Sequence, residues 1–310
     1  EERYDGLKNS VRKFVWGYDS ADPGKASAFA LRSEWLDEDQ RSGHRVKGGY
    51  GKMIGFLEDE CKNAGGLIFL NSIVKEIHWA AGKVKAITHD GTVYEAPKVI
   101  IALPLGVLQA NKNEKAAISF IPPIPEQTEA LERIGFGAVI KILFEFDTLF
   151  WEDKQTEALA GKSLKNMGFL ITDQGIPVWW TQVPGHSAVL TGWLSGPCAA
   201  KRKDMADDEI LQLSLQSLSV IFKREIKELK NKLVSFQIVN WANDPFTLGS
   251  YAYDTVETAA ARKLLNGPVE DTLFFAGEYL YEGAMMGTVE AALVSGAEVA
   301  RRILLHTNIL

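Results

Sequence analysis

Lys141 is the first residue whose surroundings suggest chemistry. It lies in the run from Gly137 to Phe146, whose β-branched and aromatic residues are typical of a strand. On a strand, Val139, Lys141, Leu143 and Glu145 share one face, while Ile140, Ile142, Phe144 and Phe146 share the other. Two interpretations stay open: a lysine on a half-exposed face, or an ammonium group in a cavity, where desolvation lowers its pKa and lets it hold a water molecule or a proton.

A second candidate is the aromatic block that starts at Trp241 and continues through Gly249, Ser250 and Tyr251. Aromatic residues around a Gly-Ser turn are common in cores. Alternatively, Trp241 and Tyr251 offer flat faces to a planar cofactor or to an amine that passes over it.

The third candidate lies near the end of the chain. An apolar run, residues 273–275, stops at Gly277 and Glu278, and after a loop of about ten residues a long amphipathic helix is predicted from Thr288 and Val289. A strand that leads through a glycine turn to a helix start leaves unpaired backbone N–H groups facing one spot. Such a spot favours an anion, or a ring that becomes anionic when it is reduced.

The elements that must position these residues are readable from the hydrophobic pattern. Helices are expected after Gly51, over 125–133 and from a cap at Asp207, with a stripe of Leu211, Leu215, Leu218 and Phe222. The expected strands are 67–70, 73–79, 84–89, 99–103, 138–146, 178–183, 188–194 and 233–240. Ala81-Gly82 and Asp90-Gly91 predict hairpin turns.

This order predicts a mixed α/β fold of two interleaved domains. One is expected to comprise 46–110 and 245–310, and the other, a mixed sheet with helices, 1–45 and 111–244.

Composition narrows the function further. The 310 residues carry a net charge of −6 and no basic block, which argues against a nucleic-acid partner. No apolar run is long enough to span a membrane. Two cysteines and five scattered histidines show no metal-ligand spacing, so no metal site is predicted, and a reduced, cytoplasmic location is the expectation.

Taken together, these motifs resemble those of the flavin-containing amine oxidases, which include monoamine oxidases, polyamine oxidases and flavin-type histone lysine demethylases. The resemblance is carried by Lys141 in its Gly-Phe-Gly context, by Phe150-Trp151, by Pro104-Leu105-Gly106-Val107-Leu108, by the Trp241–Tyr251 block, and by Phe275-Ala276-Gly277-Glu278 with Gly287-Thr288-Val289-Glu290. These motifs follow the family's order from about Val46 to Arg302.

The resemblance implies an FAD-binding domain of the Rossmann type (GR2-like), with FAD held without a covalent bond, because Ser250 stands where monoamine oxidases have a flavin-bonded cysteine. Trp241 and Pro104 match residues at the flavin. Val74 matches the residue that meets the adenine, and Gly277 and Glu278 match the turn near the ribityl-pyrophosphate. The N–H of Val289 resembles the donor to the flavin O2 atom.

For catalysis, the resemblance implies that Lys141 holds a water molecule against flavin N5 and that Tyr251 forms one wall of an aromatic cage. Thr288 stands at the opposite wall, where monoamine oxidases have a tyrosine; this departure is closer to polyamine oxidases and demethylases. Tyr281 is a further candidate for that wall, and Glu145 for attracting a second ammonium group. The implied partners are a small-molecule amine and molecular oxygen.

The family's first βαβ unit, with its glycine-rich phosphate turn, has no counterpart in these residues. The chain is therefore expected to be a carboxy-terminal fragment that is inactive alone and that self-associates, or binds a partner chain, through the face left bare. Two alternatives stay open: a relative of FAD-dependent desaturases or protoporphyrinogen oxidases, and a non-catalytic scaffold. Lys141 with Trp241 and Tyr251 favours amine oxidation.

Overall fold

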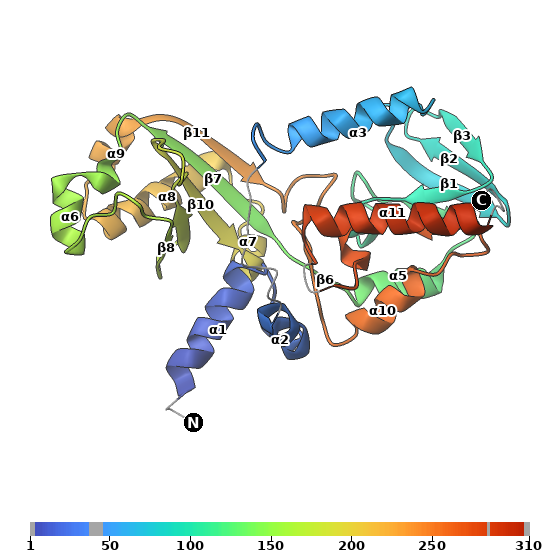
Figure 1. Cartoon of the computed structure of the whole chain (residues 1–310), viewed down its shortest axis with the longest axis horizontal. Coiled ribbons are helices and arrows are strands. Elements are labelled where there is room, and N and C mark those ends of the chain that lie inside the picture. Colours follow the sequence, from blue (N-terminus) through green and yellow to red (C-terminus); the bar gives the residue numbers. More distant parts are fainter. Residues whose placement is uncertain (1–3, 37–45, 284–285, 307–310) are drawn as a thin grey trace.

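The computed structural model describes residues 4–36, 46–283 and 286–306. Two packed units lie end to end, each around its own hydrophobic core (Figure 1). The helices are α1 (Asp5–Gly17), α2 (Ala28–Leu36), α3 (Gly51–Asn63), α4 (Leu105–Leu108), α5 (Pro125–Glu132), α6 (Lys154–Ala160), α7 (Gly196–Ala200), α8 (Asp207–Phe222), α9 (Ile226–Lys232), α10 (Thr258–Leu265) and α11 (Val289–His306). The strands are β1 (Val74–Ala80), β2 (Lys83–Thr88), β3 (Val93–Ala96), β4 (Val99–Ile101), β5 (Ser119–Ile121), β6 (Gly135–Phe136), β7 (Val139–Phe146), β8 (Phe169–Ile171), β9 (Val178–Trp180), β10 (Val189–Ser195), β11 (Leu233–Asn240), β12 (Ala252–Tyr253) and β13 (Leu273–Phe275). The mixture confirms the predicted α/β class.

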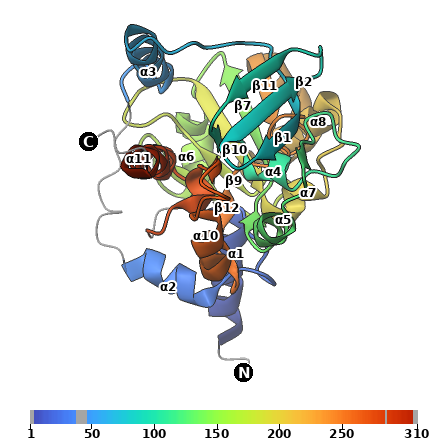
Figure 2. The ribbon, with the colours of Figure 1, turned by 90° about the vertical axis from the view of Figure 1, so that its right-hand side faces the viewer.

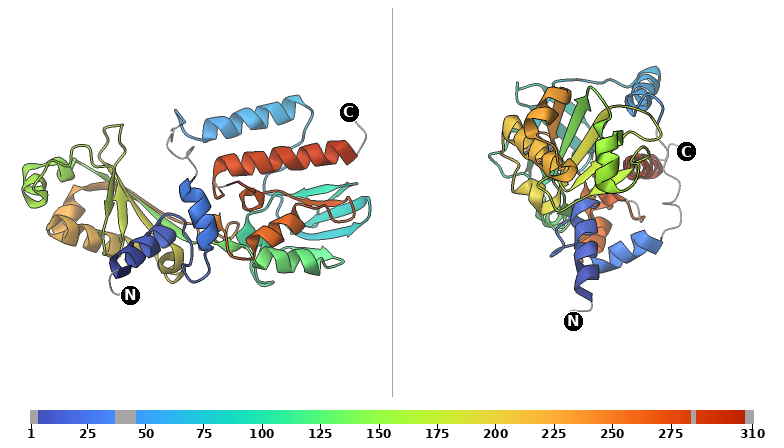
Figure 3. Two further views of the ribbon diagram at one scale, coloured as in Figure 1. Left: turned by 60° about the horizontal axis from the view of Figure 1, so that its bottom comes forward. Right: turned by 90° about the vertical axis from the view of Figure 1, so that its left-hand side faces the viewer.

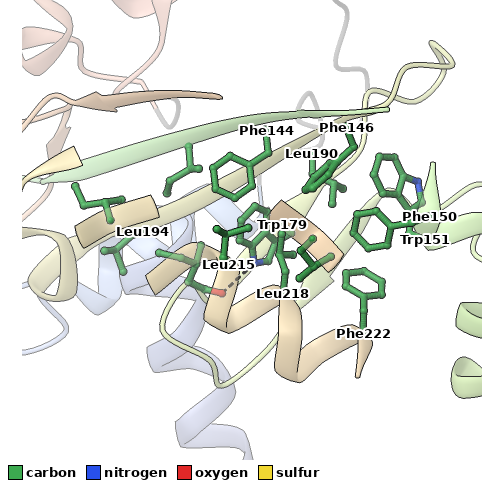
Figure 4. Close-up of a cluster of buried hydrophobic side chains, with 14 of the residues drawn as sticks. Phe144, Phe146, Phe150, Trp151, Trp179, Leu190, Leu194, Leu215, Leu218 and Phe222 are labelled. Atoms are coloured by element: carbon green, nitrogen blue, oxygen red, sulfur yellow. Dashed lines mark hydrogen bonds between the residues drawn. The ribbon is translucent and has the colours of Figure 1, made fainter. Parts of the chain in front are cut away.

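The first unit is built on an antiparallel sheet in the order β11-β7-β10-β9-β8. The predicted alternation of β7 is confirmed: the Ile140, Ile142, Phe144 and Phe146 side chains are buried in one core. Helix α8 covers that face with the predicted stripe, and Figure 4 shows Leu215, Leu218 and Phe222 turned towards Phe144, Trp179 and Phe150. The opposite face of the sheet therefore remains available for a site.

The start of α8 differs from the prediction by one residue. Ala206 occupies the cap position, and its N–H donates to the Glu209 side chain at 2.8 Å. Asp207 is the first helical residue instead, where its carboxylate still interacts favourably with the positive end of the helix.

The second unit combines a sheet in the order β3-β2-β1-β5 with a parallel pair, β4 and β13. Both predicted hairpins are confirmed, because β1, β2 and β3 pair antiparallel around turns in which Gly82 and Gly91 have positive φ. Helices α5 and α10 pack together below these strands, and α11 runs along another side (Figure 2). The carboxyl ends of β4 and β13 meet at one edge, so the segments that follow them are brought together.

The division between the units lies later in the chain than predicted. The predicted domain of residues 1–45 and 111–244 includes residues 111–134, yet β5 pairs with β1, and Ile124, Leu131 and Ile134 belong to the second unit's core. The prolines at 122–125 do not end this unit, because the chain continues directly into α5. The chain crosses between the units near β6, which pairs with β12.

Residues 67–70, predicted as a strand, form no strand, and no described strand pairs with them. Leu67 and Leu70 are 78% and 80% exposed. The prediction for residues 67–70 depended on hydrophobicity alone, whereas a strand also needs a neighbouring strand that hydrogen-bonds to its backbone N–H and C=O groups. None of the described helices is both long enough and apolar enough to cross a membrane.

Candidate active site

A cavity of about 1130 Å³ lies between α1, α2, the uncovered face of the five-stranded sheet and the segments around Tyr251 and Thr288. Helices α1 and α2 lie at the junction of the two units (Figure 3). Its walls are rich in aromatic side chains: Phe14, Tyr18, Phe169, Trp180, Trp193, Tyr251 and Tyr253. A smaller depression of about 430 Å³, beside Trp151 and His186, contains none of the predicted site residues.

Lys141 lies on the cavity side of the sheet. Trp193 of β10 pairs with Lys141 of β7 on one side and with Val178 of β9 on the other, so the three side chains point to the same face of the sheet. Trp193 and Val178 line the cavity, while Lys141 is half-buried one strand further on. The structure thus places Lys141 beside the cavity wall and not in its lining. The first residues of β7 lie near the start of α11 (Figures 1 and 3).

Tyr251 and Thr288 come together at the opposite wall, and both line the cavity. A Cβ atom at Gly287 would lie 3.0 Å from Tyr251 Cδ2, and Gly287 has φ +80°, so only glycine suits this close approach. The Thr288 hydroxyl accepts a hydrogen bond from the Ala291 N–H at 3.1 Å and so caps α11, whose first residue is Val289. Tyr281 is not among the lining residues.

Glu278 ties these segments to each other. Its carboxylate accepts hydrogen bonds from the N–H groups of Ala252 at 3.0 Å and Gly287 at 2.9 Å. Burial raises the pKa of Glu278 to about 7, although both N–H groups and the charge of Arg262 act in the opposite direction. Gly277 precedes it and donates its N–H to Ser295 at 3.1 Å. Glu278 therefore fixes the wall that contains Tyr251 relative to the start of α11.

The remaining cofactor candidates lie around the Trp241–Tyr251 block. Pro104 occupies the N-cap position before α4. A Cβ atom on Gly106 of that helix would lie 2.4 Å from the Thr247 carbonyl oxygen, so α4 packs directly on the block. Trp241 is 42% exposed and does not line the cavity. The Ser250 hydroxyl is buried without a hydrogen-bond partner among the described residues.

Val74, the candidate for contact with the adenine, lies away from the cavity. It begins β1, is half-buried against the second unit's core, and does not line the cavity. Among the described residues, no group of three or more His, Cys, Asp or Glu side chains is arranged to hold a metal ion.

The sequence interpretation missed residues 18–20, which follow α1. The Tyr251 hydroxyl donates to the Tyr18 carbonyl oxygen at 2.5 Å and accepts from the Ser20 hydroxyl at 3.0 Å. Asp19, between them, lines the cavity. No periodicity marks these residues, and the sequence offered only an acidic residue beside a tyrosine.

Known proteins resemble this chain in sequence and in fold. A family model described as "Flavin containing amine oxidoreductase" matches residues 5–304. Polyamine oxidase 4 of Oryza sativa subsp. japonica is 30% identical over 273 residues, which cover 86% of this chain and 52% of that protein. Lysine-specific histone demethylase 2 of Homo sapiens is 30% identical over 240 residues, which cover 76% of this chain and 28% of that protein.

Solved structures show the same fold. Cyclohexylamine oxidase from Brevibacterium oxydans superposes with a TM-score of 0.68 at 19% identity, covering 93% of this chain and 62% of that one. A putrescine oxidase superposes with a TM-score of 0.61 at 19% identity, covering 79% and 51%. The chain spans about half the length of the polyamine oxidases that it matches. With the family model matching nearly all of its length, the chain belongs to the flavin-containing amine oxidoreductases.

Proposed function

We propose that a protein containing this chain oxidises a carbon–nitrogen bond of a small-molecule amine, with FAD as the hydride acceptor and molecular oxygen as the reoxidant. The observation that carries this proposal is the aromatic cavity, which has Tyr251 and Thr288 on one wall and Trp193, beside Lys141, on another. Aromatic faces attract organic cations, and they also pack against apolar chains.

The residues present fit a flavin. Ser250 has a buried hydroxyl without a protein partner, and buried polar groups normally have one. Pro104 and Gly277 follow the carboxyl ends of two adjacent parallel strands, which is where α/β sheets bind nucleotides. With Trp241, Glu278, Val289 and, for the adenine, Val74, they are the residues proposed to hold FAD, without a covalent bond at Ser250.

When bound, the flavin would supply a hydride acceptor, and the chain's own residues would position the reaction. The first turn of α11, which begins at Val289, carries backbone N–H groups that would stabilise negative charge developing nearby. Tyr251 supplies the aromatic wall for the amine. The proposed role of Lys141 is to hold a water molecule or a proton between the sheet and the bound amine.

Anaerobic reduction of the flavin-loaded protein by an amine tests this assignment. Lys141→Met is expected to slow flavin reduction by about 100-fold, within the range found for proton-transfer groups. Lys83→Met is the matched control, because Lys83 is exposed on β2. An unchanged rate in Lys141→Met would show that the assigned role is wrong.

We also propose that the 310-residue chain alone binds FAD weakly, because none of its residues supplies a glycine-rich phosphate turn. Quenching of flavin fluorescence on addition of the chain measures this. Tight, stoichiometric quenching would contradict the proposal.

A further inference from the structure

We propose that Asp19 is a specificity-determining residue of this cavity, which binds the second ammonium group of a diamine and so favours diamines over monoamines of equal length. The inference rests on the proposed function, since it concerns the same cavity. The group that binds the second ammonium is thus a carboxylate in the turn after α1, and not Glu145. Glu145 is exposed and accepts a hydrogen bond from Ser235 at 2.8 Å, and it does not line the cavity.

The charges in the lining favour a cationic ligand. The two basic residues that line the cavity are each held by a carboxylate: Lys13 by Asp173 at 2.5 Å, and Arg262 by Asp254 at 2.6 Å. Asp19 also lines the cavity, and no ion pair with a described residue neutralises it. A carboxylate in a cavity without an opposing cation attracts a positive group of the ligand.

Asp19 is placed rigidly relative to the proposed reaction site. Its two neighbours, Tyr18 and Ser20, both hydrogen-bond to the hydroxyl of Tyr251. Ser20 is buried and has φ +54°, a left-handed conformation that non-glycine residues adopt only when their surroundings hold them. The peptide that carries Asp19 is therefore fixed beside the Tyr251 wall.

The aromatic surroundings suit an extended diamine. Tyr18 stacks on Phe14, with ring centroids 5.0 Å apart, and both rings line the cavity near Asp19. A methylene chain packs on such rings, and an ammonium group gains further attraction from their faces. The cavity of about 1130 Å³ exceeds what a short monoamine fills, so it has room for a longer amine.

The electrostatics around Asp19 predict a pH dependence. Burial, and then the charge of Glu34, raise the pKa of Asp19 to about 7. Tyr18 and Tyr251 also lie close to Asp19, since its charge helps to raise the pKa of both hydroxyl groups, and the Arg262–Asp254 pair lines the same cavity. A cation that binds Asp19 must compete with a proton near neutral pH. The preference for a diamine is therefore stronger at pH 8 than at pH 6.

Calorimetric titration of the 310-residue chain with octamethylenediamine and with octylamine tests the inference. At pH 8, the diamine is expected to bind about 10-fold more tightly, as one charge-assisted hydrogen bond provides. Asp19→Asn, which changes shape very little, is expected to abolish the difference. Asp59→Asn, an exposed change on α3 with the same loss of charge, is expected to keep it.

Equal affinities for the two amines at pH 8 would overturn the inference, as would a preference that survives in Asp19→Asn. The unmodified chain gives a second test: a diamine preference of the same size at pH 6 and pH 8 would also overturn it. Both readouts measure binding without turnover. If the flavin-loaded protein oxidises no amine, the proposed function fails whatever the result for Asp19.

Discussion

Removal of the Tyr251 hydroxyl tests how the turn after α1 is held against the cavity wall. In Tyr251→Phe the Tyr18 carbonyl loses its donor and the buried Ser20 hydroxyl loses its acceptor. Each hydrogen bond contributes about 0.5–1.5 kcal/mol, so the free energy of unfolding is expected to fall by about 1–3 kcal/mol. Tyr50→Phe, at an exposed tyrosine, is the control and is expected to change it by less than about 0.5 kcal/mol.

A double-mutant cycle isolates the contact itself. Ser20→Ala keeps the left-handed backbone strain that serine already has, so the strain largely cancels from the cycle. The coupling energy between Ser20→Ala and Tyr251→Phe is expected to be about 1 kcal/mol.

Urea unfolding followed by tryptophan fluorescence measures all four proteins. With a slope of roughly 1–3 kcal/mol per molar urea, a loss of about 2 kcal/mol lowers the midpoint by about 1 M. A coupling energy of zero, or an unchanged midpoint in Tyr251→Phe, would refute the account of how residues 18–20 are fixed.

Three further predictions concern groups that hold the site in place. The pKa of Glu278 is raised from 4.5 to about 7, so the folded chain binds its proton more tightly. Stability should therefore fall as pH rises from about 4.5 to 7, by up to about 1.4 kcal/mol per pH unit, and Glu278→Gln should flatten this part of the profile in thermal melts. Phe144→Ala should cost about 3–5 kcal/mol in urea unfolding, whereas Phe169→Ala, at an exposed edge-strand residue, should cost less than about 1 kcal/mol; equal losses would contradict the packing described. Arg262→Met should cost about 3–5 kcal/mol by calorimetry, because Asp254 loses its ion pair, and adding Asp254→Asn should recover part of the loss.

The elements that follow local rules were predictable from the sequence. The alternation in β7 predicted that the strand face with Ile142 and Phe144 enters the core. Gly82 and Gly91 marked the turns of two hairpins. These patterns succeed because side-chain direction on a strand and positive φ in a turn depend on neighbouring residues alone.

Features that depend on distant partners were not predictable in this way. Residues 67–70 are as apolar as a strand but have no described strand beside them, and β5 joined β1 although two prolines follow it. In the candidate site, the motifs indicated Tyr251 and Thr288, which do meet at the cavity. Asp19 was not predicted, because its position depends on the hydrogen bonds of Tyr18 and Ser20 to Tyr251, which is more than 230 residues away in the sequence.

The apolar surface at residues 67–70 also affects how the chain behaves at the bench. Ile54 and Phe56 of α3 are likewise more than half exposed, so several large hydrophobic side chains in this part of the chain contact water. Covering it releases about 25 cal/mol per Å², which favours association as concentration rises and under salting-out conditions. Light scattering should show the mean mass rising with concentration, and paired lysine substitutions at Leu67 and Leu70 should keep the chain monodisperse.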